Sequence, residues 1–264
     1  MRVQIDLTKS VQENAVHYHE LSKKAKRKLD GLAKGVVELK RKMKGASVQK
    51  AEKKLVAKKE KRWFEKFHYF RTSEGFLVVC GKDAKSNEVI VKKVMEKNDL
   101  YFHADIQGAA HTVLKTDGKK VGEVSKNEAA IFAAVFSKAW AGQVQAIDVY
   151  SASPRQVSKK APTGESIGTG GFMVYGERAW FKKTPLGFSV GFRQADGSIE
   201  IISGPPSSVA ANSDFNVKVV FGPDSKGETA KKIAAAFSKK LGKRLDITID
   251  DIVPLLPSGG MAIE

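Results

Sequence analysis

The sequence has a single cysteine, Cys80, so no disulfide can form within the 264-residue chain. Chains without disulfides are typical of reducing compartments. Its apolar neighbours, FLVVCG, predict a buried structural thiol rather than a nucleophile. No stretch approaches the ~18 uncharged apolar residues of a membrane-spanning helix, and the first residues, MRVQIDLTKS, lack the apolar core of a signal peptide. We therefore expect a cytoplasmic protein without a membrane partner.

Acidic residues are scarce relative to basic ones: 29 Asp and Glu stand against 46 Lys and Arg, a formal net charge of +17. Residues 1–66 contain 20 Lys and Arg but only 8 Asp and Glu, so most of the excess lies in the first quarter of the chain. Such a field attracts polyanions. The apolar fraction of 42% is sufficient for a folded core. We expect a basic arm attached to a nearly balanced globular part.

Apolar residues recur in alternating steps of four and three along residues 8–44. This heptad pattern predicts one long helix with a coiled-coil seam. Gly45 is typical of a helix end, and Ser47 can cap a second helix over about 48–66. Because only a short turn separates the two helices, we expect residues 1–66 to form an antiparallel helical hairpin.

The remaining residues, 67–264, are expected to form one α+β domain with a mainly antiparallel sheet and buried helices, because short strands outnumber helices without alternating with them. Glycine-containing turns between the four strands of residues 171–203 predict an antiparallel meander. Ser125 and Glu128 have the spacing of a capping box. The expected strands are 75–81, 99–104, 111–116, 146–152, 171–176, 178–183, 186–192, 198–203, 216–223 and 244–249. The expected helices are 85–95, 125–140 and 230–242.

Aromatic side chains lie beside basic ones in the stretch RWFEKFHYFR, residues 62–71. Aromatic rings can stack on unpaired bases while Arg and Lys hold phosphates. Alternatively, the rings dock the end of the second helix into the core, and the shared helical face of Trp63, Phe67 and Phe70 favours this interpretation for the rings. The candidate RNA ligands here are therefore the cations Arg62, Lys66 and Arg71.

Two further segments place lysines where a phosphate can approach the backbone. In GKDAKSNE, residues 81–88, Lys82 and Lys85 lie at the expected entrance to a helix. The alternative is a plain strand-to-helix turn capped by Asp83 or Ser86, and the sequence does not separate the two. The segment lacks the spacing of a nucleotide-binding P-loop.

In QVSKKAPTGESIGTGGF, residues 156–172, Lys159 and Lys160 precede four glycines. Glycines allow close approach of a backbone to phosphate, and lysines add charge. The alternative is a mobile hairpin connection, but the length and charge favour a contact loop.

The stretch HADIQGAAH contains potential divalent-metal ligands, His103, Asp105 and His111, so a metal-dependent hydrolase is one alternative. No fourth ligand has a recognisable spacing, which favours a strand end and a turn through Gly108. His103 is therefore kept as a candidate RNA contact. No Ser-His-Asp order, carboxylate pair or Cys-His pair stands out. We predict no catalytic residues, no metal and no cofactor, and hence no enzyme.

Four segments, taken in order, resemble the NFACT-R RNA-binding domain of the NFACT family, whose members are the NEMF-like and fibronectin-binding-protein-A-like ribosome quality control factors. They are KRWFEKFHYFRTSEGFLVVCGKDAKSNE, DLYFHADIQGAAHTVLK, SKAW and VSKKAPTGESIGTGGFMVYG. The resemblance covers about residues 62–180, and IDLTKSVQENAVHYHE is similar to the start of the family's coiled coil.

This resemblance implies binding rather than catalysis. It implies a module that contacts the large ribosomal subunit (rRNA) or tRNA on stalled nascent-chain complexes. The family's tRNA-engaging N-terminal domain has no counterpart in these 264 residues, so we do not expect autonomous untemplated tailing. The alternative function is a coiled-coil adaptor that binds a protein partner, with RNA contact incidental.

Overall fold

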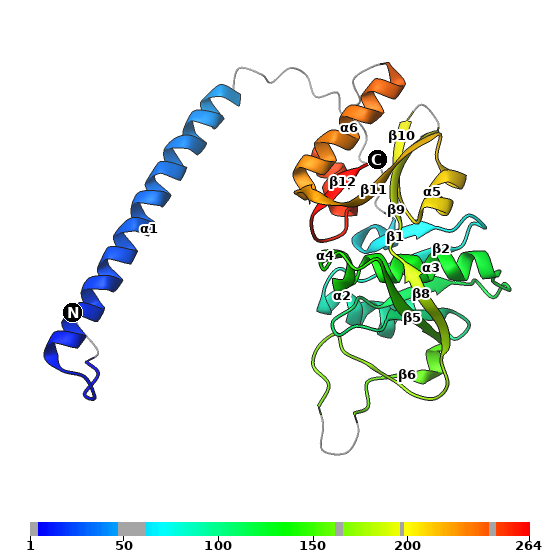
Figure 1. The fold of residues 1–264 in the computed structure, drawn as a ribbon, viewed down its shortest axis with the longest axis horizontal. Coiled ribbons are helices and arrows are strands. Elements are labelled where there is room, and N and C mark those ends of the chain that lie inside the picture. Colours follow the sequence, from blue (N-terminus) through cyan, green and yellow to red (C-terminus); the bar gives the residue numbers. More distant parts are fainter. Residues whose placement is uncertain (1–4, 47–61, 162–165, 196–197, 243–246) are drawn as a thin grey trace. The chain divides into compact units, whose positions relative to one another are not determined.

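The computed structural model describes residues 5–46, 62–161, 166–195, 198–242 and 247–264. The chain divides into two compact units, Met1–Glu60 and Lys61–Glu264. Figure 1 labels many of their helices and strands. No described helix combines the length and the apolar character needed to cross a membrane.

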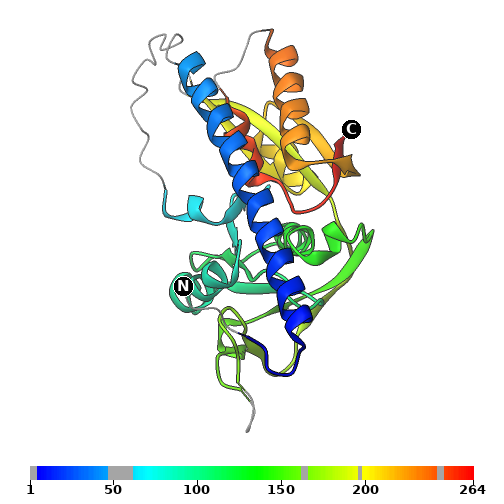
Figure 2. The same ribbon diagram turned by 90° about the vertical axis from the view of Figure 1, so that its left-hand side faces the viewer.

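The described part of the first unit is dominated by α1 (Val11–Ala46), a 36-residue helix that confirms the predicted long helix. It is drawn as one unbroken helix in Figure 2. Ser10 begins it with a capping box, because the Ser10 hydroxyl accepts the Glu13 amide at 3.2 Å while Glu13 accepts the Ser10 amide at 2.8 Å. Two seam residues, Leu29 and Leu32, are 66% and 68% exposed.

The predicted second helix of the hairpin falls mainly on residues 47–61, outside the described residues. The antiparallel pairing, and with it the domain boundary at residue 66, therefore stays a prediction. Trp63–Lys66, at the expected end of this helix, form the short 3-10 helix η1. The chain then enters a strand directly, because the Phe67 backbone is already extended.

The second unit is built on a six-stranded sheet with the order β1-β2-β4-β3-β5-β8, in which every neighbouring pair is antiparallel. Short β-branched and aromatic stretches form its inner strands, as the sequence predicts. The strands are β1 (His68–Arg71), β2 (Leu77–Cys80), β3 (Leu100–Ala104), β4 (Thr112–Lys115), β5 (Ala146–Ala152) and β8 (Ala179–Pro185).

Both faces of this sheet are buried, because alternate residues of each inner strand enter different apolar clusters. Val78 and Phe102 pack in the main core with α3 (Glu123–Val135), whereas Val79 and Tyr101 pack on the other side with Phe67 and Ile90. The second side is covered by η1, α2 (Ala84–Val89) and the π-helix η2 (Ile90–Val94). Cys80 is fully buried in the main core, and burial raises the pKa of its thiol to about 12. The prediction of a buried structural thiol is therefore confirmed.

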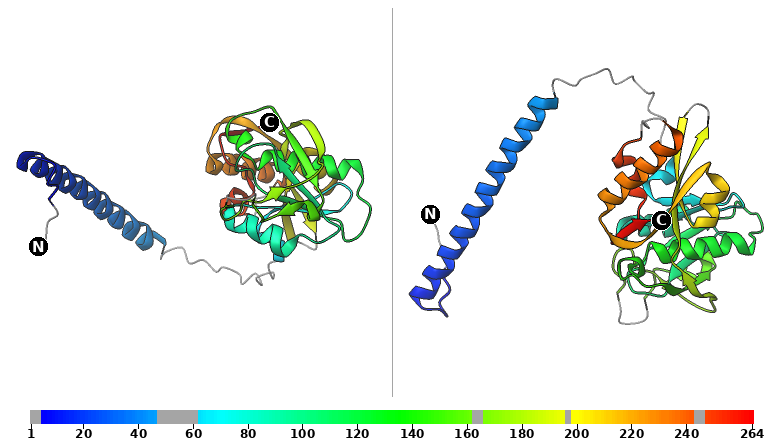
Figure 3. Two further views of the ribbon diagram at one scale, coloured as in Figure 1. Left: turned by 90° about the horizontal axis from the view of Figure 1, so that it is seen from below. Right: turned by 45° about the horizontal axis from the view of Figure 1, so that its top comes forward.

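A four-stranded antiparallel sheet of order β10-β9-β11-β12 shares the main core through Phe188 and Phe192. The helices α5 (Pro206–Asn212) and α6 (Lys226–Leu241) lie on either side of it (Figures 1 and 3). Its strands are β9 (Phe188–Ala195), β10 (Ser198–Gly204), β11 (Phe215–Asp224) and β12 (Met261–Ile263). The remaining elements are α4 (Lys138–Ala141), η3 (Pro154–Gln156), β6 (Val157–Ser158), β7 (Met173–Val174), α5 (Pro206–Asn212), α6 (Lys226–Leu241), α7 (Ile249–Ile252) and η4 (Val253–Leu255).

The fold class is confirmed as α+β, but the predicted meander is wrong. β8 joins β5 in the six-stranded sheet, β7 pairs with β6, and β9 with β10 form a hairpin in the other sheet. Glycine-containing turns favour pairing between strands that follow one another in the sequence. The observed strand pairing depends instead on the burial of two separate apolar faces.

Two local predictions are also wrong. Gly122 is the N-cap of α3, and the supposed capping residues lie inside the helix as buried polar groups. The Ser125 hydroxyl donates to Glu74, and Glu128 accepts the Ser73 amide at 2.9 Å. Residues 247–249, expected in a strand, instead lead into α7, whose N-cap is Thr248.

Candidate nucleic-acid interface

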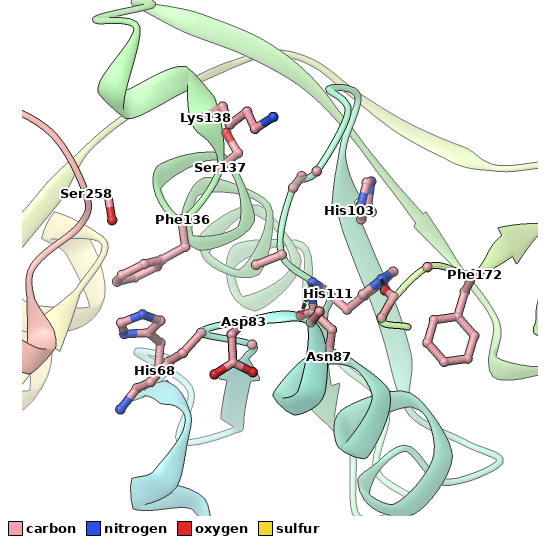
Figure 4. Close-up of a pocket in the computed structure, with 18 of the residues that line it drawn as sticks. His68, Asp83, Asn87, His103, His111, Phe136, Ser137, Lys138, Phe172 and Ser258 are labelled. Carbon is pink, nitrogen blue, oxygen red and sulfur yellow. Dashed lines mark hydrogen bonds between the residues drawn. The ribbon is translucent and has the colours of Figure 1, made fainter. Parts of the chain in front are cut away.

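A cavity of about 590 Å³ opens where four strands of the six-stranded sheet meet. β1 begins at His68, β2 ends before Gly81, β3 ends near His103 and β4 begins after His111. Because the neighbouring strands are antiparallel, these four ends come to the same edge of the sheet. The rest of the lining comes from the turn at residues 108–110, the start of α2, the junction of α3 with α4, residues 169–172 and Ser258 (Figure 4).

One wall of the cavity is an aromatic platform. The His68 and Phe136 rings are stacked, with centroids 4.0 Å apart and planes inclined by 23°. Phe136 follows α3 and packs edge-on against Phe132. Burial, followed by the charges of Lys82 and Lys226, lowers the pKa of His68 to about 3, so its imidazole is neutral at pH 7.

The opposite wall contains His103 and His111 (Figure 4). His111 Nδ1 shares a hydrogen bond with the Tyr101 hydroxyl, and Nε2 shares another with the Gly170 carbonyl at 2.7 Å. Burial is the main cause that lowers the pKa of both imidazoles to about 4. Both are therefore neutral at pH 7.

This geometry does not favour the metal interpretation. Both ring nitrogens of His111 already have partners, and Asp105 is exposed. Over the described ranges, no three His, Cys, Asp or Glu side chains gather closely enough to hold a metal ion.

Glu88 on α2 fastens the glycine loop to the domain. Its Oε2 accepts the Gly170 amide at 2.8 Å and the Lys159 ammonium at 2.9 Å, while Oε1 pairs with Lys92. Lys92, then the Gly170 amide, then Lys159 lower the pKa of Glu88 to about 2. Lys159 also donates to the carbonyls of Gly168 and Gly171, at 2.8 and 2.9 Å. The described second half of the loop is thus docked, and Lys159 acts as its internal cross-link.

Gly170 permits this docking for a steric reason. Its φ is +78°, and a Cβ there would lie 2.6 Å from the Ala84 carbonyl oxygen. Gly81 has a similar constraint, because a Cβ would lie 1.9 Å from Asn87 Oδ1, which accepts the His111 amide at 3.1 Å. The two glycines therefore let the loop and the strand end approach α2 closely.

The predicted RNA-contacting residues fall into two groups. Lys82 and His103 line the cavity, and Lys85 lies exposed on α2. Lys160 is also exposed and follows Lys159 on the loop. Whether any of them contacts RNA stays a prediction.

The second group lies on η1 and β1. Arg62 and Arg71 line a separate cleft of about 60 Å³, where Arg62 pairs with Glu65 at 2.8 Å and Glu200 at 2.7 Å. Lys66 is exposed and lies 5.1 Å from the Phe67 ring centroid. Arg62 is thus engaged with carboxylates of the domain itself.

The docking interpretation of the aromatic stretch is confirmed in part. Phe67 and Phe70 are buried, as predicted, and so is Phe64. Trp63 is 49% exposed, so its expected place on the docking face is wrong. The physical reason is that the segment changes from the helix η1 to the strand β1. Its side chains therefore do not follow one helical period, because successive side chains of a strand point to opposite faces.

The sequence reasoning missed the platform residues His68 and Phe136 and the cavity lysine Lys138. Lys138 begins α4 and lies over Gly108, whose φ is +76°; a Cβ there would lie 3.3 Å from the lysine Nζ. SKAW carried a part of the family resemblance, but nothing in its composition connects it with His68, which is 70 residues away.

A mainly antiparallel α+β domain, with a ring-lined cavity edged by lysines, has features typical of nucleic-acid-binding domains. Residues 66–176 match the family described as the NFACT protein RNA binding domain, NFACT-R. The chain corresponds to the C-terminal region of the NFACT family and contains its RNA-binding domain. All residues lining the cavity except Ser258 lie within the matched range.

The chain is 41% identical over 208 residues to the archaeal Rqc2 homolog aRqcH of Methanocaldococcus jannaschii, covering 78% of this chain and 30% of that relative. It is 34% identical over 206 residues to the ribosome quality control complex subunit NEMF homolog of Drosophila melanogaster, covering 75% and 21%. The chain therefore spans less than a third of the length of these relatives. The solved C-terminal structure of the Streptococcus suis fibronectin/fibrinogen-binding protein matches 47% of each chain, with 28% identity and a TM-score of 0.39.

Proposed function

We propose that this chain is the RNA-binding part of a ribosome quality control factor. In this proposal residues 1–66 are a basic arm, and residues 67–264 are the domain that contacts large-subunit rRNA or tRNA on stalled nascent-chain complexes. The module binds and does not catalyse, and it acts in the cytoplasm. The names of the relatives support a role in ribosome quality control, since the Drosophila relative is a ribosome quality control complex subunit homolog.

The observation that carries the proposal is the set of lysines without acidic partners around the cavity of the NFACT-R domain. Within the described part of the chain, none of their ammonium groups forms an ion pair with a carboxylate. They are Lys82, Lys85, Lys138 and Lys160. Cations that are not neutralised internally gain most from phosphate, because they release the counterions condensed on RNA. Exposed lysines of α1, such as Lys24 and Lys28, make the first unit basic as well.

The test is co-sedimentation with separated large and small ribosomal subunits at two salt concentrations. Four phosphate contacts on unpaired RNA give a slope of about −0.7 per contact in log affinity against log salt. Raising salt from about 50 to 200 mM should then weaken binding to the large subunit about 50-fold. Affinity that stays flat over this interval would contradict electrostatic capture.

A charge reversal at Lys160 tests the loop itself. Lys160→Glu should weaken binding to the large subunit, whereas Lys119→Glu is the matched control. Lys119 follows β4 at the end of the sheet away from the cavity and is also exposed. Lys159 is unsuitable, because Lys159→Glu would place a second carboxylate against Glu88 and release the loop. Equal affinity for the Lys160 and Lys119 variants would remove this loop from the interface.

The adaptor function is kept as a second candidate because of the exposed apolar seam of α1, where Leu29 and Leu32 are both more than 60% exposed. Coiled-coil seams pair with other helices. Deleting residues 8–60 separates the two functions. If capture of a protein partner is lost while RNA affinity persists, the adaptor function gains; if RNA affinity falls as well, the basic arm serves RNA binding.

A further inference from the structure

We propose that the 590 Å³ cavity is a pocket for one unpaired nucleotide, with the base stacked on the His68–Phe136 platform and the phosphate at Lys82 and Lys138. This inference rests on the proposed function, because it takes RNA as the ligand. It adds that one unpaired nucleotide of the RNA enters the domain. A nucleotide in a duplex has its base covered on both faces, so the pocket selects single strands, loops or flipped bases.

The size and the walls of the cavity fit such a ligand. Its volume lies within the ~300–1,000 Å³ typical of small-molecule sites. Figure 4 shows His68 and Phe136 on one side and His103 and His111 on the other. The low pKa values leave the imidazoles neutral at pH 7, so they act as flat, weakly polar surfaces. Stacking on rings of this kind tolerates any base, because every base has a π-face.

Polar groups at the cavity can meet a base edge. The Asn87 side-chain oxygen is held by the His111 amide at 3.1 Å, which leaves its NH₂ group as a donor. The hydroxyl of Ser258 also borders the cavity. Ser137, in contrast, is occupied, because its hydroxyl donates to the Ala134 carbonyl at 2.6 Å and accepts the Ala139 amide at 3.1 Å.

The phosphate assignment follows from the two lysines. Burial lowers the pKa of Lys82, and the charge of Asp83 only partly opposes this, so the ammonium is partly desolvated without a carboxylate bonded to it. Asp83 itself is engaged, because its Oδ1 accepts the Ser86 amide at 2.7 Å. Lys138 approaches the same cavity from α4. A phosphate bound there would pair with the partly desolvated ammonium of Lys82 and with the exposed ammonium of Lys138.

The test compares a single-stranded oligoribonucleotide with a blunt duplex of the same length, each carrying 2-aminopurine. Binding of the single strand should quench the fluorophore, because the base stacks on the platform. His68→Ala should weaken single-strand binding about 5- to 150-fold, the range for loss of one base stack, and should abolish the quenching. His68→Phe keeps a ring and should retain both. Duplex affinity should not change in either variant.

Lys138→Gln is a second test of the pocket. This side chain is exposed, so the substitution does not disturb the packing of the core. It should weaken single-strand binding, while the exposed pair Lys119→Gln and Lys120→Gln should not. If the wild-type protein binds the single strand but His68→Ala and Lys138→Gln both leave affinity and quenching unchanged, the pocket proposal is overturned and RNA binding stands. If the wild-type protein binds neither RNA, the proposed function fails and the pocket proposal fails with it.

Discussion

We expect the domain to lose stability as the pH falls from 7 to 5, because the histidines around the cavity have lowered pKa values in the folded state. Burial lowers the folded-state pKa of His68 to about 3, and those of His103 and His111 to about 4. In the unfolded chain a histidine titrates near 6.5. Between these values the unfolded state binds protons that the folded state does not, so acid favours unfolding. The stabilisation is complete above the unfolded pKa and decreases as the pH falls toward the folded values.

The size of the effect follows from linkage. Each histidine that is protonated only when unfolded contributes about 1.4 kcal/mol per pH unit below 6.5, or about 2 kcal/mol between pH 7 and pH 5. Three such groups add to at most about 6 kcal/mol, because His103 and His111 influence one another. Carboxylates contribute little in this window, since their unfolded pKa values lie near 4.

The assay is urea denaturation at pH 7, 6 and 5. His68→Phe keeps the stacked ring and removes one titrating group, so its loss of stability over this range should be about 2 kcal/mol smaller than that of the wild type. Ser258→Ala, which borders the same cavity without a titrating group, should behave as the wild type does. A free energy of unfolding that is constant from pH 7 to 5, or the same pH dependence with and without His68, would refute the reasoning.

Two other perturbations test contacts that hold the domain together. Lys115→Met should lower the free energy of unfolding by about 3–5 kcal/mol, because it leaves Asp99, which is 2.6 Å from the Lys115 ammonium, as a buried unpaired charge. Urea denaturation measures this, Lys119→Met is the exposed control, and a loss below about 1 kcal/mol would contradict it. Gly170→Ala should detach the loop from α2 at a cost of about 1–3 kcal/mol, because of the positive φ and the contact with Ala84. Amide hydrogen exchange at residue 170, now bonded to Glu88, should accelerate, and unchanged protection would show that the loop adapts.

Much of the secondary structure was predictable because it depends on local periodicity. The alternating steps of four and three along residues 8–44 correspond to α1, and the apolar run before Gly81 corresponds to β2. α6 ends at Leu241 and is capped by Gly242 with φ +65°, as expected of a glycine after a periodic stretch. In each case the signal lies within a few residues of the structure that it specifies.

The candidate site was predictable only in part. Lys82 and His103 were identified from their neighbours in sequence, and both line the cavity. Lys159 had the expected charge and position, but no local pattern indicates that its ammonium pairs with Glu88, which is 71 residues away. The predicted capping box is wrong for the same reason. Ser125 and Glu128 form hydrogen bonds with Glu74 and Ser73, which are distant in the sequence.

The sequence by itself determined the basic arm, the α+β composition and the resemblance to an RNA-binding family, because charge, periodicity and motif order are properties of the chain. Tertiary structure alone decided which strand ends meet and which rings face them. His68 and Phe136 form one platform because antiparallel pairing brings the start of β1 to the edge where α3 ends. It also decided which lysines are neutralised, because an ion pair requires two charges within a few ångströms, whatever their separation along the chain.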